Sequence, residues 1–255
     1  MTRKSLTATL LLLSAGVFAQ THSAIPAAAE TSAKTPAAHG YYYIDPSSLH
    51  LDRILPPPPS QNSAATTAEL TELHSIEAAR TPAQVGQAEA DDQEEDIFIF
   101  KTVLGPSFTA EALPLTAALS AHLRKDEAAG GGALKTIYRR PRPYQVDSTL
   151  HPVCPLNAEP TSYPSGHSLS GYLLAFTLMQ LVPEKRQQIL DRADQYAHNR
   201  LICGVHYASD TQAGRIVAYA IFGSLAASPK FQQDLAAASE ETRRKLGLPL
   251  VLSQQ

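Results

Sequence analysis

Residues 162–182 read SYPSGHSLSGYLLAFTLMQLV, a short polar turn followed by a long apolar run. The apolar part, residues 168–182, is shorter than the roughly 20 residues that a membrane span needs, and it contains Ser and Gly, so we expect a helix in a protein core. The Pro-Ser-Gly turn predicts a helix start, where unpaired backbone N–H groups can bind an anion. Taken alone, the turn is also explained by an ordinary helix start that Ser165 caps.

The rest of the chain favours helices as well. From Thr66 onward the apolar residues are spaced as in helices, with no alternating strand pattern and no repeat of 20–50 residues. The acidic residues before Ile97 are expected in the first turns of their helix, because the helix dipole favours negative charge there. The triple glycine at 130–132 is expected to end a helix. The expected helices span residues 66–80, 89–104, 109–128, 133–140, 168–182, 183–202, 206–227 and 229–247.

The N-terminal part has a different composition. Residues 1–19, MTRKSLTATLLLLSAGVFA, combine a basic start, an apolar centre and a small-x-small end, which predicts a signal peptide. Residues 20–60 predict a flexible leader that continues into an extended Pro-rich arm. Residues 61–255 are expected to form the folded domain. The sequence thus predicts an all-α fold, a single-domain helical bundle with an irregular Pro-rich N-terminal arm.

Charge and hydropathy exclude some classes of partner. The formal net charge is −3 over 255 residues, whereas a general nucleic-acid-binding protein is normally basic. After the predicted signal peptide, no apolar run is long enough to cross a membrane. We therefore expect an exported protein, periplasmic or secreted, with neither a nucleic-acid nor a membrane partner.

The chain has two cysteines, Cys154 and Cys203. Export places them in an oxidising compartment, where a disulfide persists. The even count favours a bridge, although two buried free thiols fit the sequence almost as well. A bridge would close a loop of about fifty residues and contribute roughly 3–4 kcal/mol to stability.

Two further motifs flank the turn. KTIYRRPRP begins at Lys135 and includes Arg142, seven residues or two helical turns later, so both cations are expected on one face. NRLICGVHYASD contains Arg200, and its His206 and Asp210 are four residues apart, within contact distance on a helix. These motifs add fixed positive charge and a His–carboxylate pair to a possible anion site.

Together the three motifs hold what phosphoryl transfer needs. Lys and Arg side chains, with Ser165 and the N–H of Gly166, would bind the phosphate oxygens. His206 is the candidate nucleophile, because Asp210 can orient its ring and stabilise its cation. His167 has no carboxylate four residues away, so it is the candidate acid for the leaving group. The motifs contain no cluster at metal-ligand spacing, so no metal or other cofactor is expected.

Each motif also has a structural explanation. Arg139, Arg140 and Arg142 fit a solvated basic patch. His206 with Asp210 fits a surface pair worth a few tenths of a kcal/mol. The occurrence of both around a Pro-Ser-Gly-His turn favours the catalytic interpretation.

The motifs KTIYRRPRP, YPSGH and RLICGVHYASD resemble the three-part signature of the PAP2 phosphatase and vanadium haloperoxidase superfamily. With LPPPPS and KFQQDL outside them, the chain is most similar to the bacterial class A non-specific acid phosphatases. The resemblance covers most of the chain. It implies a PAP2-type helical domain and an acid phosphatase that hydrolyses small phosphate monoesters of broad range through a phosphohistidine, without a metal. Phosphotransferase side activity and a homo-oligomer are implied as well.

The same resemblance assigns roles to individual residues. It makes His167 the acid, His206 the nucleophile and Asp210 its orienting partner. The phosphate would be bound by Lys135, Arg142, Ser165, Gly166 and Arg200.

Two positions depart from the family pattern. Asn199 stands where Ser is usual, but its amide can still donate to the phosphate or to a neighbouring side chain. Tyr207 stands where Trp is frequent, which leaves the shape of the substrate rim open.

Three other functions are alternatives. A haloperoxidase is disfavoured by the modest length of the chain and by its likeness to the phosphatases outside the motifs. A membrane lipid phosphatase is disfavoured because the chain lacks spans of about 20 apolar residues. A phosphate-binding protein without turnover would not need the His–Asp pair.

Overall fold

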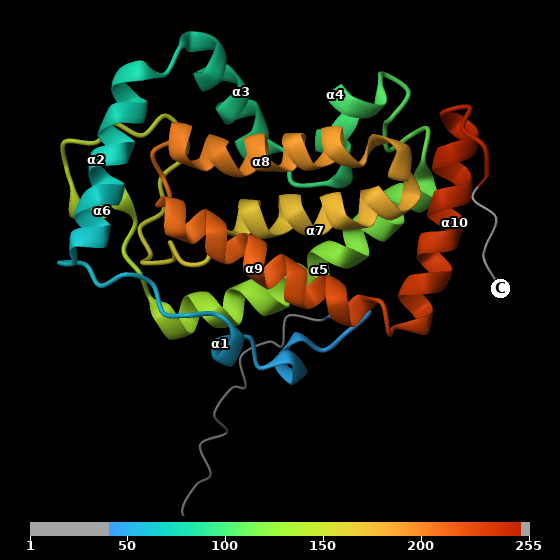
Figure 1. The fold of residues 1–255 in the computed structure, drawn as a ribbon, viewed down its shortest axis with the longest axis horizontal. Coiled ribbons are helices and arrows are strands. Elements are labelled where there is room, and N and C mark those ends of the chain that lie inside the picture. The colour runs from blue at the N-terminus through green and yellow to red at the C-terminus, as the bar shows by residue number, and fades with distance from the viewer. Residues whose placement is uncertain (1–40, 251–255) are drawn as a thin grey trace, which may run out of the picture. The chain divides into compact units, whose positions relative to one another are not determined.

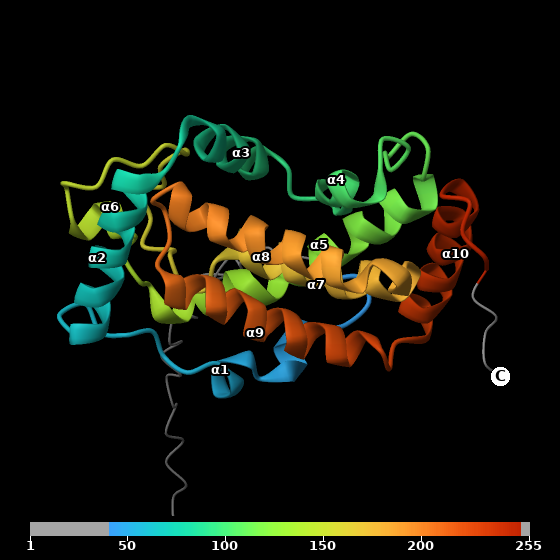
Figure 2. The ribbon, with the colours of Figure 1, turned by 45° about the horizontal axis from the view of Figure 1, so that its top comes forward.

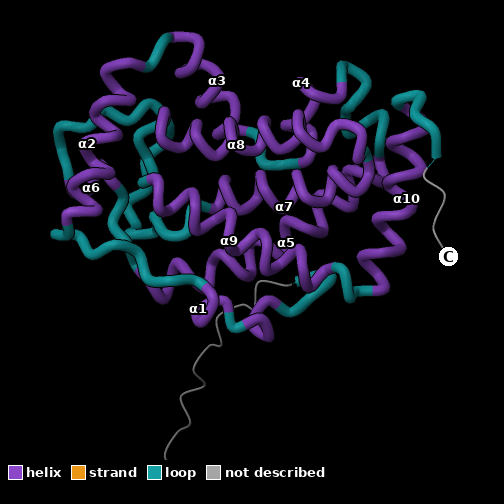
Figure 3. The backbone as a smooth tube through the Cα atoms, in the orientation of Figure 1, coloured by secondary structure: helices purple, strands orange, loops and turns teal. Residues whose placement is uncertain are grey.

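The computed structural model describes residues 41–250, so the predicted signal peptide (1–19) and the leader from 20 to 40 lie outside the described residues. Within that range the regular structure is helical, with no strand (Figure 3), which confirms the all-α prediction. The longer helices are α2 (Ala64–Ala79), α3 (Pro82–Gln93), α5 (Pro114–Tyr138), α7 (Gly166–Leu181), α8 (Arg186–Ile202), α9 (Ala208–Leu225) and α10 (Pro229–Lys245). The short ones are η1 (Pro46–Leu49), α1 (Leu51–Ile54), η2 (Ile97–Phe100), α4 (Lys101–Leu104), α6 (Pro143–Val146) and η3 (Pro183–Lys185).

Helix α7 is the centre of the bundle. It packs against α8 on one side and against α9 and α5 on the other, and α10 also contacts it (Figures 1 and 2). Every α7 side chain from Ser168 to Leu178 is buried, as expected for a helix that other helices enclose. The prediction of a core helix is thus confirmed. No helix within residues 41–250 has the length and apolar character of a membrane span.

The triple glycine does not end a helix. Helix α5 continues without a break through residues 130–132, so the prediction of two shorter helices is wrong. A Cβ on Gly130 would lie 3.2 Å from Cδ1 of Ile221 and 3.3 Å from Cδ1 of Leu51. The glycine therefore lets α9 and the N-terminal arm approach α5 closely, and this packing offsets the low helix propensity of glycine.

The acidic residues before Ile97 lie at the end of a helix rather than at its start. Helix α3 ends at Gln93, so the prediction that these residues form a first turn is wrong. The helix dipole disfavours negative charge at this end, but ion pairs with α8 oppose that effect. Asp91 pairs with Arg192 at 2.6 Å, and Asp92 pairs with Arg200 at 2.7 Å.

The Pro-rich arm packs on α5 and the turn before α7. Leu51 and Leu55 are buried in the main core. The hydroxyl of Tyr138 donates to the carbonyl of Leu55 at 2.8 Å, and that of Tyr163 donates to the carbonyl of Pro56 at 2.6 Å. The arm therefore braces the segments that carry two of the three motifs.

Candidate active site

The three motifs meet where several helix ends converge. The eight predicted site residues lie there: Lys135 in the last turn of α5, Arg142 before α6, Ser165, Gly166 and His167 at the start of α7, Arg200 in the last turn of α8, and His206 and Asp210 around the start of α9. Lys135 and Arg142 do not share a helical face, because α5 ends at Tyr138 and Arg139 has a left-handed φ of 44°. A loop, rather than helix periodicity, brings the second cation to the site.

His206 is buried and contacts a partner through each ring nitrogen. Its Nδ1 lies 3.3 Å from Oδ2 of Asp210, and its Nε2 lies 3.2 Å from a terminal nitrogen of Arg142. Arginine can only donate, so these contacts require a proton on Nδ1 and a lone pair on Nε2. Burial, then the charges of Arg142 and Arg200, lowers the pKa of His206 well below its ordinary 6.5. A neutral ring with Nε2 unprotonated is the state that a nucleophile requires.

Asp210 receives more donors than the sequence indicates. Its Oδ2 accepts from the Ser162 hydroxyl at 2.6 Å and from the Tyr207 N–H at 2.9 Å, and its Oδ1 accepts from Arg140 at 2.7 Å. Burial raises the pKa of Asp210 to about 6, while Arg140 is the strongest influence in the opposite direction. Arg140 is buried and also pairs with Glu69 of α2 at 2.9 Å. The solvated-patch explanation of Arg140 is therefore wrong.

Two buried arginines have donors left unused. Arg142 donates to the carbonyl of Val205 at 3.0 Å, and Arg200 pairs with Asp92 at 2.7 Å. The Nε–H of each has no acceptor among the residues that the structure describes. Buried donors are normally satisfied, and an anion with several oxygens would satisfy both.

Lys135 lies close to the start of α7. A Cβ placed on Gly166 would be 3.6 Å from Nζ of Lys135 and 3.9 Å from Oε1 of Glu127. Glu127 is buried and was not evident from the motifs. Burial raises its pKa to about 7, and burial, then Arg142, lowers the pKa of Lys135. The site therefore holds a titratable carboxyl that lies, like its lysine, beside Gly166.

His167 has a carboxylate neighbour that its position in the sequence does not reveal. No carboxylate lies four residues away along the chain, but the loop after α3 places Oε1 of Glu95 3.1 Å from Nε2 of His167. The carbonyl oxygen of Asp92 lies 3.2 Å from the same nitrogen. Burial, then Arg200, lowers the pKa of His167 to about 4, while Glu95 acts to raise it.

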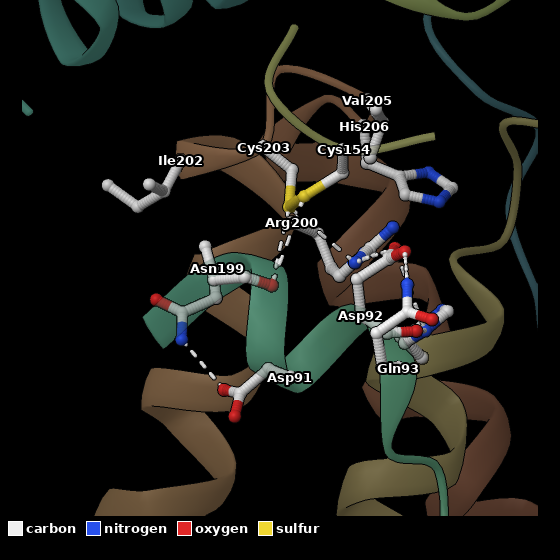
Figure 4. Close-up of a disulfide and its surroundings, with 12 residues drawn as sticks. Asp91, Asp92, Gln93, Cys154, Asn199, Arg200, Ile202, Cys203, Val205 and His206 are labelled. Atoms are coloured by element: carbon white, nitrogen blue, oxygen red, sulfur yellow. Dashed lines mark hydrogen bonds and ion pairs between the residues drawn. A yellow bond between two sulfur atoms is a disulfide. The ribbon is translucent and has the colours of Figure 1, made fainter. Parts of the chain in front are cut away.

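The two residues that depart from the family pattern, Asn199 and Tyr207, contact residues around the site. Asn199 donates to Asp91 at 2.7 Å, and Figure 4 shows it turned toward Asp91 while Arg200 extends toward Asp92. The buried ring of Tyr207 lies 3.8 Å from the guanidinium carbon of Arg140. Tyr207 thus packs on Arg140 and exposes almost none of its surface.

A disulfide joins Cys154 to Cys203 beside the site (Figure 4). It links the loop before α7 to the end of α8, and a terminal nitrogen of Arg200 lies 3.7 Å from Sγ of Cys203. The two sulfurs and Asp92 form the one group of possible metal ligands found between residues 41 and 250. Because the sulfurs are bonded to each other, only one carboxylate of that group remains as a ligand, whereas zinc sites use three or four.

Comparison with known proteins places the chain in a family. The PAP2 superfamily model matches residues 113–233, which include all eight predicted site residues. The chain is 33% identical over 213 residues to a non-specific acid phosphatase of Salmonella typhi, covering 79% of this chain and 83% of that protein. It is 28% identical over 250 residues to a non-specific acid phosphatase of Providencia stuartii, covering 91% and 96%. The chain therefore belongs to the class A non-specific acid phosphatases of the PAP2 superfamily and is a phosphoric monoester hydrolase.

Proposed function

We propose that this acid phosphatase hydrolyses a broad range of small phosphate monoesters through a phosphohistidine on His206. The observation that carries the proposal is the environment of the His206 ring. Asp210 contacts Nδ1, and the Nε2 lone pair faces a terminal nitrogen of Arg142. When a phosphate oxygen takes over the Arg142 N–H, the Nε2 lone pair would be freed to attack the phosphorus held by that arginine.

The phosphate would be bound mainly by groups that the protein leaves unsatisfied. The Nε–H donors of Arg142 and Arg200 would each bind a phosphate oxygen, and Lys135 would add a third positive charge. The N–H of Gly166 lies in the first turn of α7, where no intrahelical acceptor exists. Ser165 accepts from the Ser168 N–H at 3.4 Å, so its own hydroxyl proton can be donated to the phosphate.

Hydrolysis would proceed in two steps. In the first, the Nε2 lone pair of His206 forms a bond to phosphorus, the bond from phosphorus to the ester oxygen breaks, and His167 gives a proton to the departing alkoxide. In the second, His167 takes a proton from water while the water oxygen bonds to phosphorus and the P–N bond breaks. Asp210 stabilises the charged ring between the two steps. An alcohol in place of water would give phosphotransferase side activity.

The proposal includes no metal, because the lysine and the two arginines can balance the phosphate charge. It also includes export after removal of residues 1–19 and assembly into a homo-oligomer. N-terminal sequencing of the protein recovered outside the cytoplasm and light scattering of the purified protein test these two statements.

A phosphate-release assay with the purified protein tests the function. We expect turnover of nucleoside monophosphates, sugar phosphates and aryl phosphates between pH 5 and 7, unchanged by EDTA. Vanadate should inhibit it without producing halide oxidation in the presence of peroxide. Activity that EDTA abolishes and a divalent cation restores would contradict the metal-free mechanism. Phosphate release from only one of these esters would contradict the broad specificity.

A further inference from the structure

The loop between α3 and η2 places Glu95 against the catalytic acid candidate. Oε1 of Glu95 lies 3.1 Å from Nε2 of His167, and the side chains of the two residues are 33% and 18% exposed. Glu95 is itself fixed from α5, since Arg124 donates both to its carbonyl oxygen and to its carboxylate. The contact therefore joins His167 to a carboxylate that Arg124 already holds in place.

The partners of His167 determine which nitrogen carries a proton. Nε2 faces the Glu95 carboxylate and the carbonyl of Asp92 at 3.2 Å, and both can only accept. Nε2 must therefore be protonated. This leaves Nδ1 as the nitrogen that exchanges a proton with the leaving group, and it can do so as an acid only when the ring is an imidazolium.

Burial, and after it the charge of Arg200, opposes that imidazolium. The charged and titratable groups that face it come from several elements: Asp92 of α3, Glu95 of the following loop, Glu127 and Lys135 of α5 near Gly166, Tyr196 and Arg200 of α8, and His206. Burial, then Arg200, lowers the pKa of His167 to about 4, and Glu95 is the strongest influence that raises it. A bound phosphate dianion would add negative charge and raise this pKa further.

We propose that Glu95 is a positioning residue that orients His167 through Nε2 and, together with the bound phosphate, stabilises its protonated ring for transfer to the leaving group. Glu95 does not touch the phosphorus or the ester oxygen in this account and acts only through His167. The inference rests on the proposed function, because it assumes that His167 protonates a leaving group.

Kinetics of Glu95→Gln test the proposal, with Glu94→Gln as the matched control. Gln keeps the shape and an acceptor but removes the charge, and the side chain of Glu94 is exposed. On glycerol phosphate, whose alkoxide needs a proton, we expect Glu95→Gln to lower kcat at least tenfold at pH 6. On p-nitrophenyl phosphate, whose phenolate leaves without one, kcat should fall less than threefold. Glu94→Gln should match the wild type on both esters.

The pH profile gives a second readout. Loss of the Glu95 charge lowers the pKa of His167, so the limb on which activity falls with rising pH should move about one unit lower for glycerol phosphate in Glu95→Gln. Histidine-labelled protein saturated with inorganic phosphate allows the same shift to be followed by NMR, with His167→Ala used to assign the signal. This titration needs no turnover.

The outcomes separate this inference from the function on which it rests. An equal loss of kcat on both esters in Glu95→Gln would overturn the role of Glu95. So would a pH profile and a His167 titration that are the same in Glu95→Gln as in the wild type. In either case, the phosphatase activity of the wild type would still support the proposed function. A wild-type protein without a phosphohistidine would remove the proposed mechanism, but the NMR shift would still report whether Glu95 stabilises the protonated ring of His167.

Discussion

Glu127 is a carboxyl group whose protonation state changes near neutral pH. Burial raises its pKa to about 7 from an ordinary 4.5, so the folded protein retains a proton that the unfolded chain releases. The free energy of unfolding should therefore decrease by about 3 kcal/mol as the pH rises from 4.5 to 7. Glu127→Gln should remove this component. Chemical denaturation from pH 4.5 to 8 measures it, and Glu72→Gln, at an exposed position, should retain the wild-type dependence.

Arg139 and Arg140 are adjacent in the sequence, but Arg140 is buried and Arg139 is exposed, so the pair allows a buried charge to be compared with a surface charge. Arg140→Ala would leave Asp210, which is fully buried, without its cation, and such a loss typically costs 3–5 kcal/mol. Arg139→Ala, at an exposed position, should change stability by less than about 0.5 kcal/mol. Urea denaturation of both variants checks this. A cost for Arg140→Ala no larger than that for Arg139→Ala would show that Asp210 does not depend on the pair.

The sequence identified the residues of the three motifs but not the carboxylates around them. The spacing of His206 and Asp210 predicts their contact, because four residues bring two side chains together at a helix start. Glu69 and Glu95 reach the site from distant segments, and an ion pair across such a separation leaves no periodic signal. The dense acidic run at 89–96 is the one sequence feature that indicates such pairs, because so many carboxylates beside a buried segment require nearby cations.

At the scale of helices, the crossing of α9 over the start of α7 sets the distance between Asp210 and the phosphate-binding turn. A Cβ on Gly214 would lie 2.7 Å from the carbonyl oxygen of Ser165 and 2.8 Å from the N of Leu169. Gly214→Ala should therefore push α9 away, cost about 1–3 kcal/mol and lower kcat at least tenfold. Gly223→Ala lies on the same helix, has no atom within 4 Å of its added Cβ, and should leave kcat unchanged. Equal kcat values in both variants would contradict the role of the crossing.

The disulfide acts on the loop that precedes α7. Cys154 and Cys203 are separated by 49 residues, and a closure of that length contributes about 4 kcal/mol in the chain-entropy model. The double variant Cys154→Ser with Cys203→Ser should lose that stability in thermal or urea unfolding. Dithiothreitol should destabilise the wild type by a similar amount and leave the double variant unaffected. A wild type that is indifferent to reductant would contradict the bridge.

The first and last residues of the helices were harder to predict from the sequence than the presence of the helices. The apolar run of α7 predicts a core helix, because a helix enclosed by others needs apolar residues on every side. The glycines at 130–132 and the acidic end of α3 each contradict a local rule. In both places tertiary partners decide: Ile221 packs over Gly130, and Arg200 pairs with Asp92. Such partners cannot be assigned from local sequence.

At the scale of the whole molecule, the site exists only because segments far apart in the chain meet at the ends of several helices. The nucleophile candidate precedes α9, the acid candidate begins α7, and the phosphate-binding cations come from α5, the loop before α6, and α8. Asp92 of α3 pairs with Arg200, Glu127 of α5 lies near Gly166 as Lys135 does, and Glu69 of α2 pairs with Arg140, the partner of Asp210. The proposed reaction therefore depends on which of the two histidines, His206 or His167, forms the bond to phosphorus.

Trapping of the phosphoenzyme tests that point most directly. Wild type, His167→Ala and His206→Ala would each be mixed with labelled p-nitrophenyl phosphate and stopped in alkaline detergent, because a P–N bond survives alkali but not acid. His167→Ala should accumulate label on the peptide that contains His206, since the nitrophenolate leaves without a proton but water is no longer activated. His206→Ala should carry no covalent phosphate. Label retained by His206→Ala and absent from His167→Ala would reverse the two roles and contradict the account.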